Sequence, residues 1–238
     1  LQTISVDDGG ITLGAGVSYT RAFEAIRREI PALGRLIERI GGQQVRNMGT
    51  IGGNIANGSP IGDTPPALIA LGATIRLRSA SGSRELSLED YFIDYGKQDR
   101  RAGEFVETIR VPRPAEGDQF AVYKISKRRD EDISALCGAF QLTLGEDGTV
   151  AHIRIAFGGM AATPKRARAV EAALLGKPWS EATIADARDA FDEDYKPLTD
   201  WRATADYRQL TAKNLLTRFF LETTGTPQEL RRFAEEQA

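Results

Sequence analysis

Glycine is concentrated in one stretch of the chain, together with small polar side chains. Seven of the 22 residues from Gly41 to Gly62 are glycine, where an average composition of ~7% would give one or two. Glycine lets successive backbone N–H groups turn toward one point and lets the chain approach a ligand closely. Thr50, Asn54 and Ser59 can donate hydrogen bonds to a phosphate or a ribose, and the carboxylate of Asp63 can accept one from a hydroxyl. This combination predicts a site for a phosphate-bearing ligand.

The motif does not by itself identify that ligand. It lacks the Gly-Lys-Ser/Thr ending of the Walker phosphate loop, and it does not match the Gly-x-Gly-x-x-Gly dinucleotide fingerprint that follows a strand. An ordinary surface loop rich in turn residues is the alternative. Long loops without secondary structure in a compact domain are usually functional, which favours the binding site.

The elements before and after the glycine-rich stretch must position it. Two short apolar runs flank the turn Asp8-Gly9-Gly10, which is typical of a hairpin over Thr3 to Gly16. Helical periodicity begins at Thr20 as a cap and again at Pro31, and the second segment stops at Gly41-Gly42. Between Gln43 and Asp63 we find no helical or strand periodicity. The expected elements that follow are a short helix at Ala67 to Leu71, strands at Ala73 to Arg78 and Phe105 to Val111, and a helical connection at Leu88 to Ile93.

Pro112 and Pro114 mark the best candidate for a domain boundary. Beyond it we expect strands at Gln119 to Ser126, Ile133 to Leu144 and Val150 to Phe157, and helices at Pro164 to Leu175, Glu181 to Asp192 and Ala205 to Thr223. The predicted fold class is α+β. Residues 1–114 form part of a mixed α/β binding domain that carries the glycine-rich loop, residues 115–225 form an antiparallel sheet packed on helices, and residues 226–238 form a charged tail.

Composition limits the partners and the chemistry. Net charge is −2 and the 31 Lys and Arg residues are scattered among acidic ones, so nucleic acid is not an expected partner. No apolar run approaches the ~20 residues of a membrane helix, and no secretory leader is seen. With one Cys and one His, this chain cannot by itself hold an iron–sulfur cluster or a structural zinc. We expect a cytoplasmic setting. Because the chain begins at Leu1 with a strand-like run, we expect it to be a piece of a longer polypeptide.

Several motifs together resemble one protein family. The string Gly49-Thr50-Ile51-Gly52-Gly53-Asn54-Ile55-Ala56, with Ser59-Pro60 and Asp63, is similar to the second FAD-contacting segment of the molybdenum hydroxylase flavoproteins, which include xanthine dehydrogenases, aldehyde oxidases and carbon monoxide dehydrogenases. The resemblance continues through 103–112. The segments 123–133, 157–161, 206–208 and 214–220 resemble the xanthine dehydrogenase branch, and the joint match covers nearly the whole chain.

This resemblance implies roles for individual residues. Ile40 and Gly41 would lie near the adenine end of FAD, and Ile40 stands where some relatives carry an aromatic residue. The pyrophosphate and ribityl chain would be lined by Thr50, Gly52, Gly53, Asn54 and Ala56, with Ser59 nearby. Asp63 would accept a hydrogen bond from the cofactor, Val106 would contact the isoalloxazine edge, and Lys124 would add positive charge on the polar side of the ligand. No side chain is expected to act as a catalytic acid or nucleophile.

The family also implies partners that this chain does not contain. An earlier phosphate loop of the FAD site lies upstream of the segment that begins here. Xanthine would be hydroxylated at a molybdenum centre on another subunit or domain, and electrons would pass through two iron–sulfur clusters upstream to FAD and then to NAD, within a larger hetero-oligomer. In relatives, the loop equivalent to Lys127 to Asp132 governs the access of NAD; a solvated mixed-charge loop is the alternative. Other molybdenum hydroxylases, a flavin-free assembly module and a flavin oxidase that uses oxygen stay open as alternatives.

Overall fold

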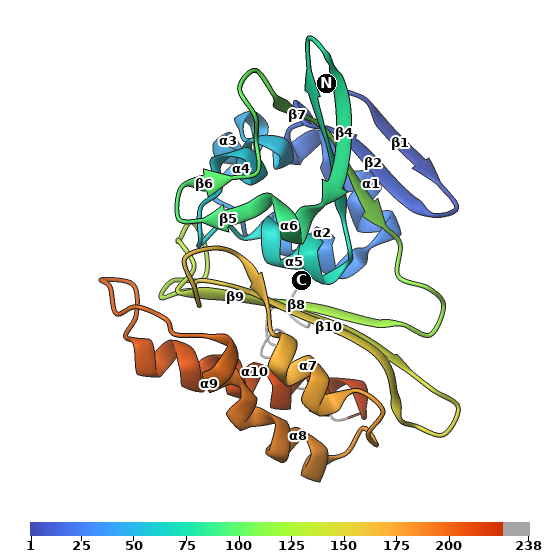
Figure 1. The fold of residues 1–238 in the computed structure, drawn as a ribbon, viewed down its shortest axis with the longest axis vertical. Helices are drawn as coiled ribbons and strands as arrows, with labels where there is room; N and C mark the ends of the chain where they lie inside the picture. The colour runs from blue at the N-terminus through green and yellow to red at the C-terminus, as the bar shows by residue number, and fades with distance from the viewer. Residues whose placement is uncertain (226–238) are drawn as a thin grey trace, which may run out of the picture.

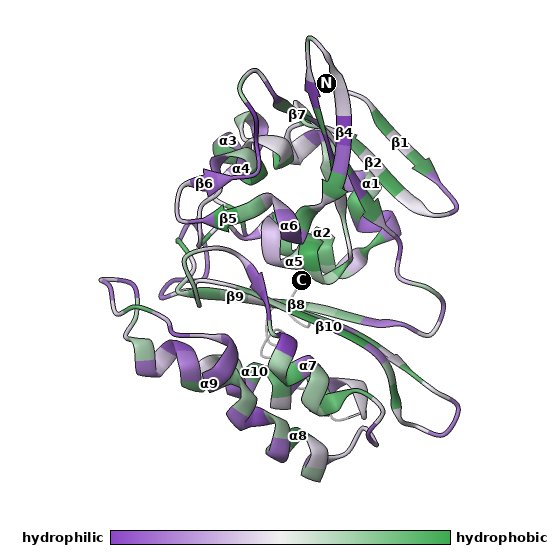
Figure 2. Ribbon diagram, viewed as in Figure 1, coloured by the Kyte–Doolittle hydropathy of each residue, from purple (hydrophilic) through white to green (hydrophobic). Residues whose placement is uncertain are grey.

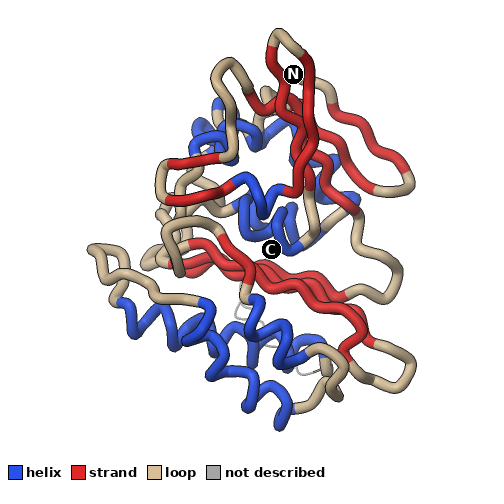
Figure 3. Tube along the Cα trace, viewed as in Figure 1, coloured by secondary structure: helices blue, strands red, loops and turns tan. Residues whose placement is uncertain are grey.

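A four-stranded antiparallel sheet lies across the middle of the molecule and has helices on both faces (Figure 1). The computed structural model describes residues 1–225. The sheet has the order β11-β10-β9-β8 and is built from Gln119–Ile125 (β8), Leu136–Leu144 (β9), Val150–Gly158 (β10) and Lys165–Arg166 (β11). Helices from the first part of the chain cover one face and helices from the last part cover the other. The colouring by element type in Figure 3 makes this layering plain.

The first part of the chain contains a second antiparallel sheet. Its order is β1-β2-β7-β3-β4, with Ile4–Asp7 (β1), Gly10–Gly14 (β2), Thr74–Ser79 (β3), Gly82–Ser87 (β4) and Phe105–Pro112 (β7). A small hairpin, Phe92–Asp94 (β5) and Lys97–Gln98 (β6), lies beside it. Its helices are Tyr19–Glu29 (α1), Pro31–Glu38 (α2), Gln43–Met48 (α3), Ile51–Asn57 (α4), Thr64–Ala70 (α5) and Leu88–Tyr91 (α6). Helices α2 and α5 pack on the central sheet, so both sheets share one apolar core.

The last part of the chain is helical. It comprises Arg168–Leu174 (α7), Glu181–Ala187 (α8), the 3₁₀ turn Arg188–Ala190 (η1), Phe191–Asp194 (α9) and Ala205–Thr223 (α10). Within residues 1–225, no helix is both long enough and apolar enough to cross a membrane.

Alternation of side-chain size along the central strands separates the two faces. On β9, Leu136, Phe140 and Leu142 join the cluster under α7 to α10, whereas Cys137 and Ala139 join the cluster around α5. Successive residues of a strand point to opposite faces, so one strand can present large residues to one layer and small ones to the other. Figure 2 shows mainly green ribbon around α2 and α5, where the first part of the chain packs on the central sheet.

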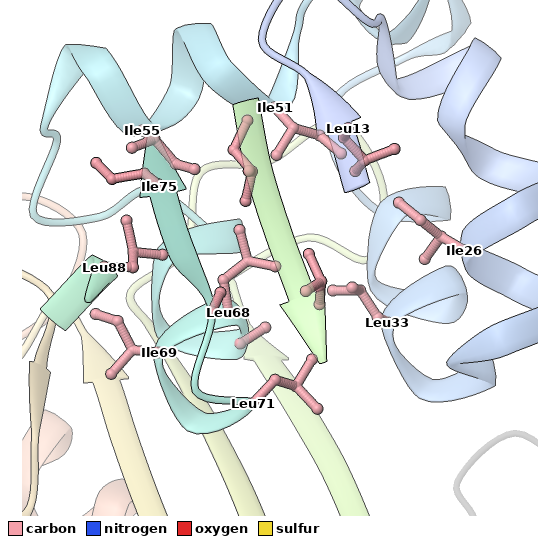
Figure 4. Packing of buried hydrophobic residues seen from close by; sticks show 14 of the residues in the cluster. Leu13, Ile26, Leu33, Ile51, Ile55, Leu68, Ile69, Leu71, Ile75 and Leu88 are labelled. Carbon is pink, nitrogen blue, oxygen red and sulfur yellow. The ribbon is translucent and has the colours of Figure 1, made fainter. Parts of the chain in front are cut away.

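The short helix α4 is anchored on the five-stranded sheet. Ile51 and Ile55 are buried, and Figure 4 shows Ile51 facing Leu13 while Ile55 lies beside Ile75. A Cβ on Gly52 would come within 2.4 Å of the Ala15 Cβ atom. Only glycine therefore allows α4 to approach the β2–α1 connection this closely.

The predicted fold class is confirmed, and several element predictions need correction. The stretch Gln43 to Asp63 was expected to lack helix but contains α3 and α4. Its helical turns are too short to show periodicity. Helix α4 is also capped at both ends: Thr50 Oγ1 accepts from the Gly53 amide at 2.9 Å, and Gly58 ends the helix with a left-handed φ of 64°. Ser18, rather than Thr20, caps α1.

The second half shows smaller differences. The helix expected from Pro164 begins at Arg168, because Lys165–Arg166 pair with β10 as β11. The helix expected over Glu181 to Asp192 is divided by the 3₁₀ turn, whereas Ala205–Thr223 is confirmed with the predicted bounds. Strand β4 and the β5–β6 hairpin were not predicted. The charged tail predicted at 226–238 lies outside the described residues, and the domain boundary near Pro112 stays a prediction.

Phe140 lies at the centre of the aromatic cluster on the helical side of the sheet. Its ring centroid is 5.1 Å from that of Phe219, 5.6 Å from Phe157 and 5.8 Å from Tyr123. We expect Phe140→Ala to lower the free energy of unfolding by about 3–5 kcal/mol, because it leaves a cavity in a packed core. Urea unfolding followed by circular dichroism measures this. Leu144→Ala, on the same strand but 38% exposed, is the control, and a similar loss in both variants would contradict the expectation.

Candidate functional site

A cavity of about 340 Å³ opens where the first part of the chain meets β8 and the loop that follows it. It collects residues that are far apart in the sequence, from α1, the end of α2, α3, α4, the 59–63 segment and β8. The lining residues are Tyr19, Ile40, Gly41, Val45, Asn54, Asn57, Ser59, Ile61, Gly62, Asp63, Lys124, Glu131, Asp132, Ile133 and Ser134. Six of the eleven residues predicted from the sequence are among them: Ile40, Gly41, Asn54, Ser59, Asp63 and Lys124.

A buried ion pair forms part of the wall of this cavity. The Lys124 ammonium lies 2.6 Å from Asp63 Oδ2 and donates to Ser134 Oγ at 2.9 Å, while Ser134 Oγ donates to Asp63 Oδ1. The side chain of Lys124 is 2% exposed and that of Asp63 is 10% exposed. Each of these buried charges is stabilised by the other, because an unpaired buried charge is very unfavourable. Both residues were predicted from the sequence to contact the ligand, but their pairing with each other was not.

Asn54 and its neighbours form a second polar group in the cavity. Thr64, which begins α5 and is 1% exposed, donates through Oγ1 to Asn54 Oδ1 at 2.6 Å. The ring of Tyr19 lies under Gly49 and its hydroxyl is buried. Burial raises the pKa of Tyr19 well above its ordinary value, so the hydroxyl keeps its proton.

Two arginine side chains hold the walls of the cavity together. Arg46 of α3 donates to the carbonyls of Ile40 and Gly41, at 3.3 and 2.6 Å. Arg39, after α2, donates to the Lys124 carbonyl at 2.8 Å and to the Arg129 carbonyl at 3.1 Å. These contacts fix the end of α2 against both α3 and β8.

The loop predicted to control NAD access borders the cavity. Glu131 has a positive φ of 52°, which is uncommon for a residue with a side chain. Asp132 accepts from the Arg128 amide at 2.7 Å, and this hydrogen bond is the main reason why the pKa of Asp132 is lowered. Lys127 reaches across to the Trp201 carbonyl at 2.8 Å. The gating role of this loop stays a prediction.

The other five predicted residues lie outside the cavity wall. Thr50, Gly52, Gly53 and Ala56 belong to α4 or its cap, and Val106 is buried on β7 opposite Leu77. Their assignment to the cofactor stays a prediction. Tyr19 and Ser134 were not predicted from the sequence, since neither belongs to the glycine-rich motif. The apolar pattern around Tyr19 indicated only a helix, and Ser134 falls inside a predicted strand.

Two family models cover the chain almost end to end. Residues 1–114 match the FAD binding domain in molybdopterin dehydrogenase, and residues 121–223 match the CO dehydrogenase flavoprotein C-terminal domain. The glyceraldehyde dehydrogenase medium chain of Sulfolobus acidocaldarius is 34% identical over 93% of this chain and 79% of its own length. This chain belongs to the flavoprotein family of the molybdenum hydroxylases.

Other members of the molybdenum hydroxylase flavoprotein family extend the comparison. A solved structure of carbon monoxide dehydrogenase from Hydrogenophaga pseudoflava superposes with a TM-score of 0.85 and 32% identity, over 91% of this chain and 76% of that one. The xanthine dehydrogenase of Emericella nidulans is 28% identical over 92% of this chain. The chain spans only 17% of that enzyme, and 15% of the nicotinate hydroxylase hnxS of the same fungus, which is 33% identical over 80% of this chain.

The cavity in this flavoprotein domain suits FAD. The cofactor carries hydroxyls, phosphates and a ring with polar edges, and the wall offers an ammonium, a carboxylate, an amide and backbone approached through Gly41 and Gly62. The buried Tyr19 hydroxyl has no hydrogen-bond partner of good geometry among residues 1–225, which is typical of a polar region adapted to a ligand.

The Asp63–Lys124 pair gives a prediction about stability. We expect Lys124→Met to lower the free energy of unfolding by about 3–5 kcal/mol, because the Asp63 carboxylate loses its buried partner. The double variant Lys124→Met, Asp63→Asn removes both charges and should recover most of this loss. Urea titration of the flavin-free protein measures both. If the double variant is as unstable as the single one, unpaired charge is not the cause.

Proposed function

We propose that this chain is the FAD-binding electron-transfer part of a xanthine dehydrogenase. In this proposal it takes electrons from iron–sulfur clusters and passes hydride from reduced FAD to NAD, while hypoxanthine and xanthine are oxidised to urate at a molybdenum centre on another subunit or domain. The assembly is a hetero-oligomer of the cytoplasm. The motifs at 123–133, 157–161, 206–208 and 214–220 support the xanthine branch.

The observation that carries the flavin assignment is the cavity itself. It brings Asn54, Asp63 and Lys124 to one place, although they come from α4, the segment before α5, and β8. A flavin-free assembly module would have no need for a buried ion pair and an unpartnered buried hydroxyl at one cavity. FAD, when bound, supplies the hydride and electron transfer chemistry, and the protein supplies binding, orientation and electrostatics.

Each group of the wall has a distinct task in this proposal. The Asp63 carboxylate accepts from a hydroxyl of the cofactor, and the Lys124 ammonium holds that carboxylate in place. The Ile40 side chain and the Gly41 backbone lie on the side assigned to adenine. The 127–132 loop, held by Arg39 and by the Trp201 carbonyl, stands beside the cavity where it can restrict access of an electron acceptor.

A different molybdenum hydroxylase is the second candidate. The glyceraldehyde dehydrogenase medium chain is 34% identical to this chain, against 28% for the xanthine dehydrogenase of E. nidulans. An aldehyde or carbon monoxide would then be the reductant, with the same role for FAD. In either case the substrate is bound outside this flavoprotein part.

We expect the full polypeptide that contains residues 1–238 to keep a flavin absorption spectrum after desalting. The pair Asn54→Ala, Asp63→Ala should lose that spectrum, because it removes two polar groups of the cavity wall. The pair Asn214→Ala, Asp189→Ala, on the helical side of the molecule, is the matched control and should keep it. A polypeptide that holds no flavin even with added FAD would overturn the cofactor assignment.

The same preparation separates the candidate functions. In the intact complex without oxygen, bleaching of the flavin by xanthine supports the first proposal, and bleaching by an aldehyde or by carbon monoxide but not by xanthine supports the second. Adding NAD or oxygen to the reduced complex then identifies the acceptor. Rapid recovery of the flavin spectrum with oxygen but none with NAD would contradict the NAD assignment.

A further inference from the structure

Two of the motifs that resemble the xanthine dehydrogenase branch meet in the folded chain. Gly158 and Gly159 lie at the end of β10, and Arg208 lies in the first turn of α10. The Arg208 guanidinium donates through Nη1 to the Gly159 carbonyl at 2.6 Å and through Nη2 to Asp200 Oδ1 at 2.7 Å. Arg208 is 3% exposed, and its rigid planar group fixes the positions of both acceptors. Neither motif lines the cavity.

The turn formed by Gly158 and Gly159 lies directly behind one wall of the cavity. The Gly159 amide donates to the Pro60 carbonyl at 2.7 Å. A Cβ on Gly158 would lie 3.2 Å from the Pro60 carbonyl oxygen and 3.3 Å from that of Gly62. Pro60 belongs to the 59–63 segment, and the other residues of this segment all line the cavity. The backbone of the turn therefore supports the segment from outside the cavity.

The same turn touches a second wall. A Cβ on Gly159 would lie 2.6 Å from the Ala135 carbonyl oxygen, and the φ of Gly159 is 83°, which favours glycine. Ala135 follows Ser134, which lines the cavity and contacts both Asp63 and Lys124. One turn is thus in contact with both segments that flank the buried ion pair.

We propose that Arg208 is a positioning residue for the FAD cavity. It fixes the Gly159 carbonyl, and the turn held in that place sets the spacing between the 59–63 segment and Ser134. Arg208 acts from α10, which lies on the face of the central sheet opposite α2 and α5 (Figure 1), and it does not touch the ligand. The inference rests on the proposed binding of FAD in this cavity, and it gives the motifs at 157–161 and 206–208 a common task.

The first test compares two buried arginines. Arg208→Met removes the guanidinium and keeps an apolar stem of similar length. We expect it to raise the Kd for FAD about tenfold, the effect of losing one well-placed interaction in the site. Fluorescence titration of the flavin-free full polypeptide with FAD measures the Kd without turnover, at a temperature where circular dichroism shows each variant to be folded.

Arg154 supplies the matched control. It also donates to a backbone carbonyl, that of Ile69 at 2.7 Å, and it lies 3.5 Å from the carboxylate of Glu89. None of these three residues lines the cavity or touches the turn. Arg154→Met should therefore cost stability but leave the Kd unchanged. If Arg208→Met binds FAD as tightly as the wild type, or if Arg154→Met weakens binding equally, the proposal is wrong although FAD binding stands.

A second pair of variants tests the turn without altering Arg208, and it decides the question if Arg208→Met does not fold. Gly159→Ala must displace the turn and should raise the Kd for FAD. Gly148→Ala introduces the same kind of backbone strain, at a φ of 74°, but with no atom within 4 Å of the new Cβ, and should leave the Kd unchanged. Since Arg208→Met and Gly159→Ala act on one turn, their effects on the Kd should be non-additive. Additive effects would overturn the proposal.

A third measurement does not depend on FAD. In the flavin-free polypeptide, Arg208→Met should speed amide hydrogen exchange in peptides that contain residues 59–63, because the segment loses the support behind it, and Arg154→Met should not. Mass spectrometry measures this exchange, and an unchanged rate in Arg208→Met would overturn the proposal. Should the wild type bind no FAD at all, the proposed function fails, and the exchange rates still decide whether Arg208 holds this segment.

Discussion

The cavity depends on one buried ion pair. Asp63 precedes α5, which packs under the central sheet, and Lys124 is a residue of that sheet. Their contact at 2.6 Å therefore ties the glycine-rich half of the molecule to the second half at the point where the cavity opens. Desolvation makes each charge unfavourable alone, and this is why the pair fixes a geometry more firmly than an exposed ion pair would.

Other contacts across the same boundary follow this pattern. Arg39, directly after α2, donates to the backbone of β8 and of the loop after it. Farther along the sheet, Arg154 of β10 donates to the Ile69 carbonyl near the end of α5, at 3.1 and 2.7 Å. Glu89 of α6 lies 3.3 to 3.5 Å from the guanidinium groups of Arg154, Arg166 and Arg168. Charged side chains thus join the first part of the chain to the central sheet around an apolar interface.

Much of this was readable from the sequence, and the failures have physical reasons. Strands of the central sheet and the helix Ala205–Thr223 have long apolar patterns, which report burial directly. Helices α3 and α4 have 6 and 7 residues, too few to show periodicity, so tertiary contacts and, for α4, its caps determine where they form. The glycine-rich motif indicated Asn54 and Asp63, and resemblance to the family supplied Lys124. Neither the motif nor the resemblance could predict Tyr19, Thr64 or Ser134, because these side chains gain their roles only when distant segments meet.

Strand β8 shows how closely the two halves are joined. Lys124 points to the cavity, while its neighbour Tyr123 points to the helical layer, where its hydroxyl donates to Glu222 of α10 at 2.6 Å. A shift of the strand by one residue would bring a phenol to the carboxylate of Asp63 and an ammonium into an aromatic cluster. The register of this edge strand is therefore fixed from both faces, because neither face can accept the side chain that belongs to the other. An insertion or deletion within β8 would therefore disrupt the contacts on both faces of the strand at once.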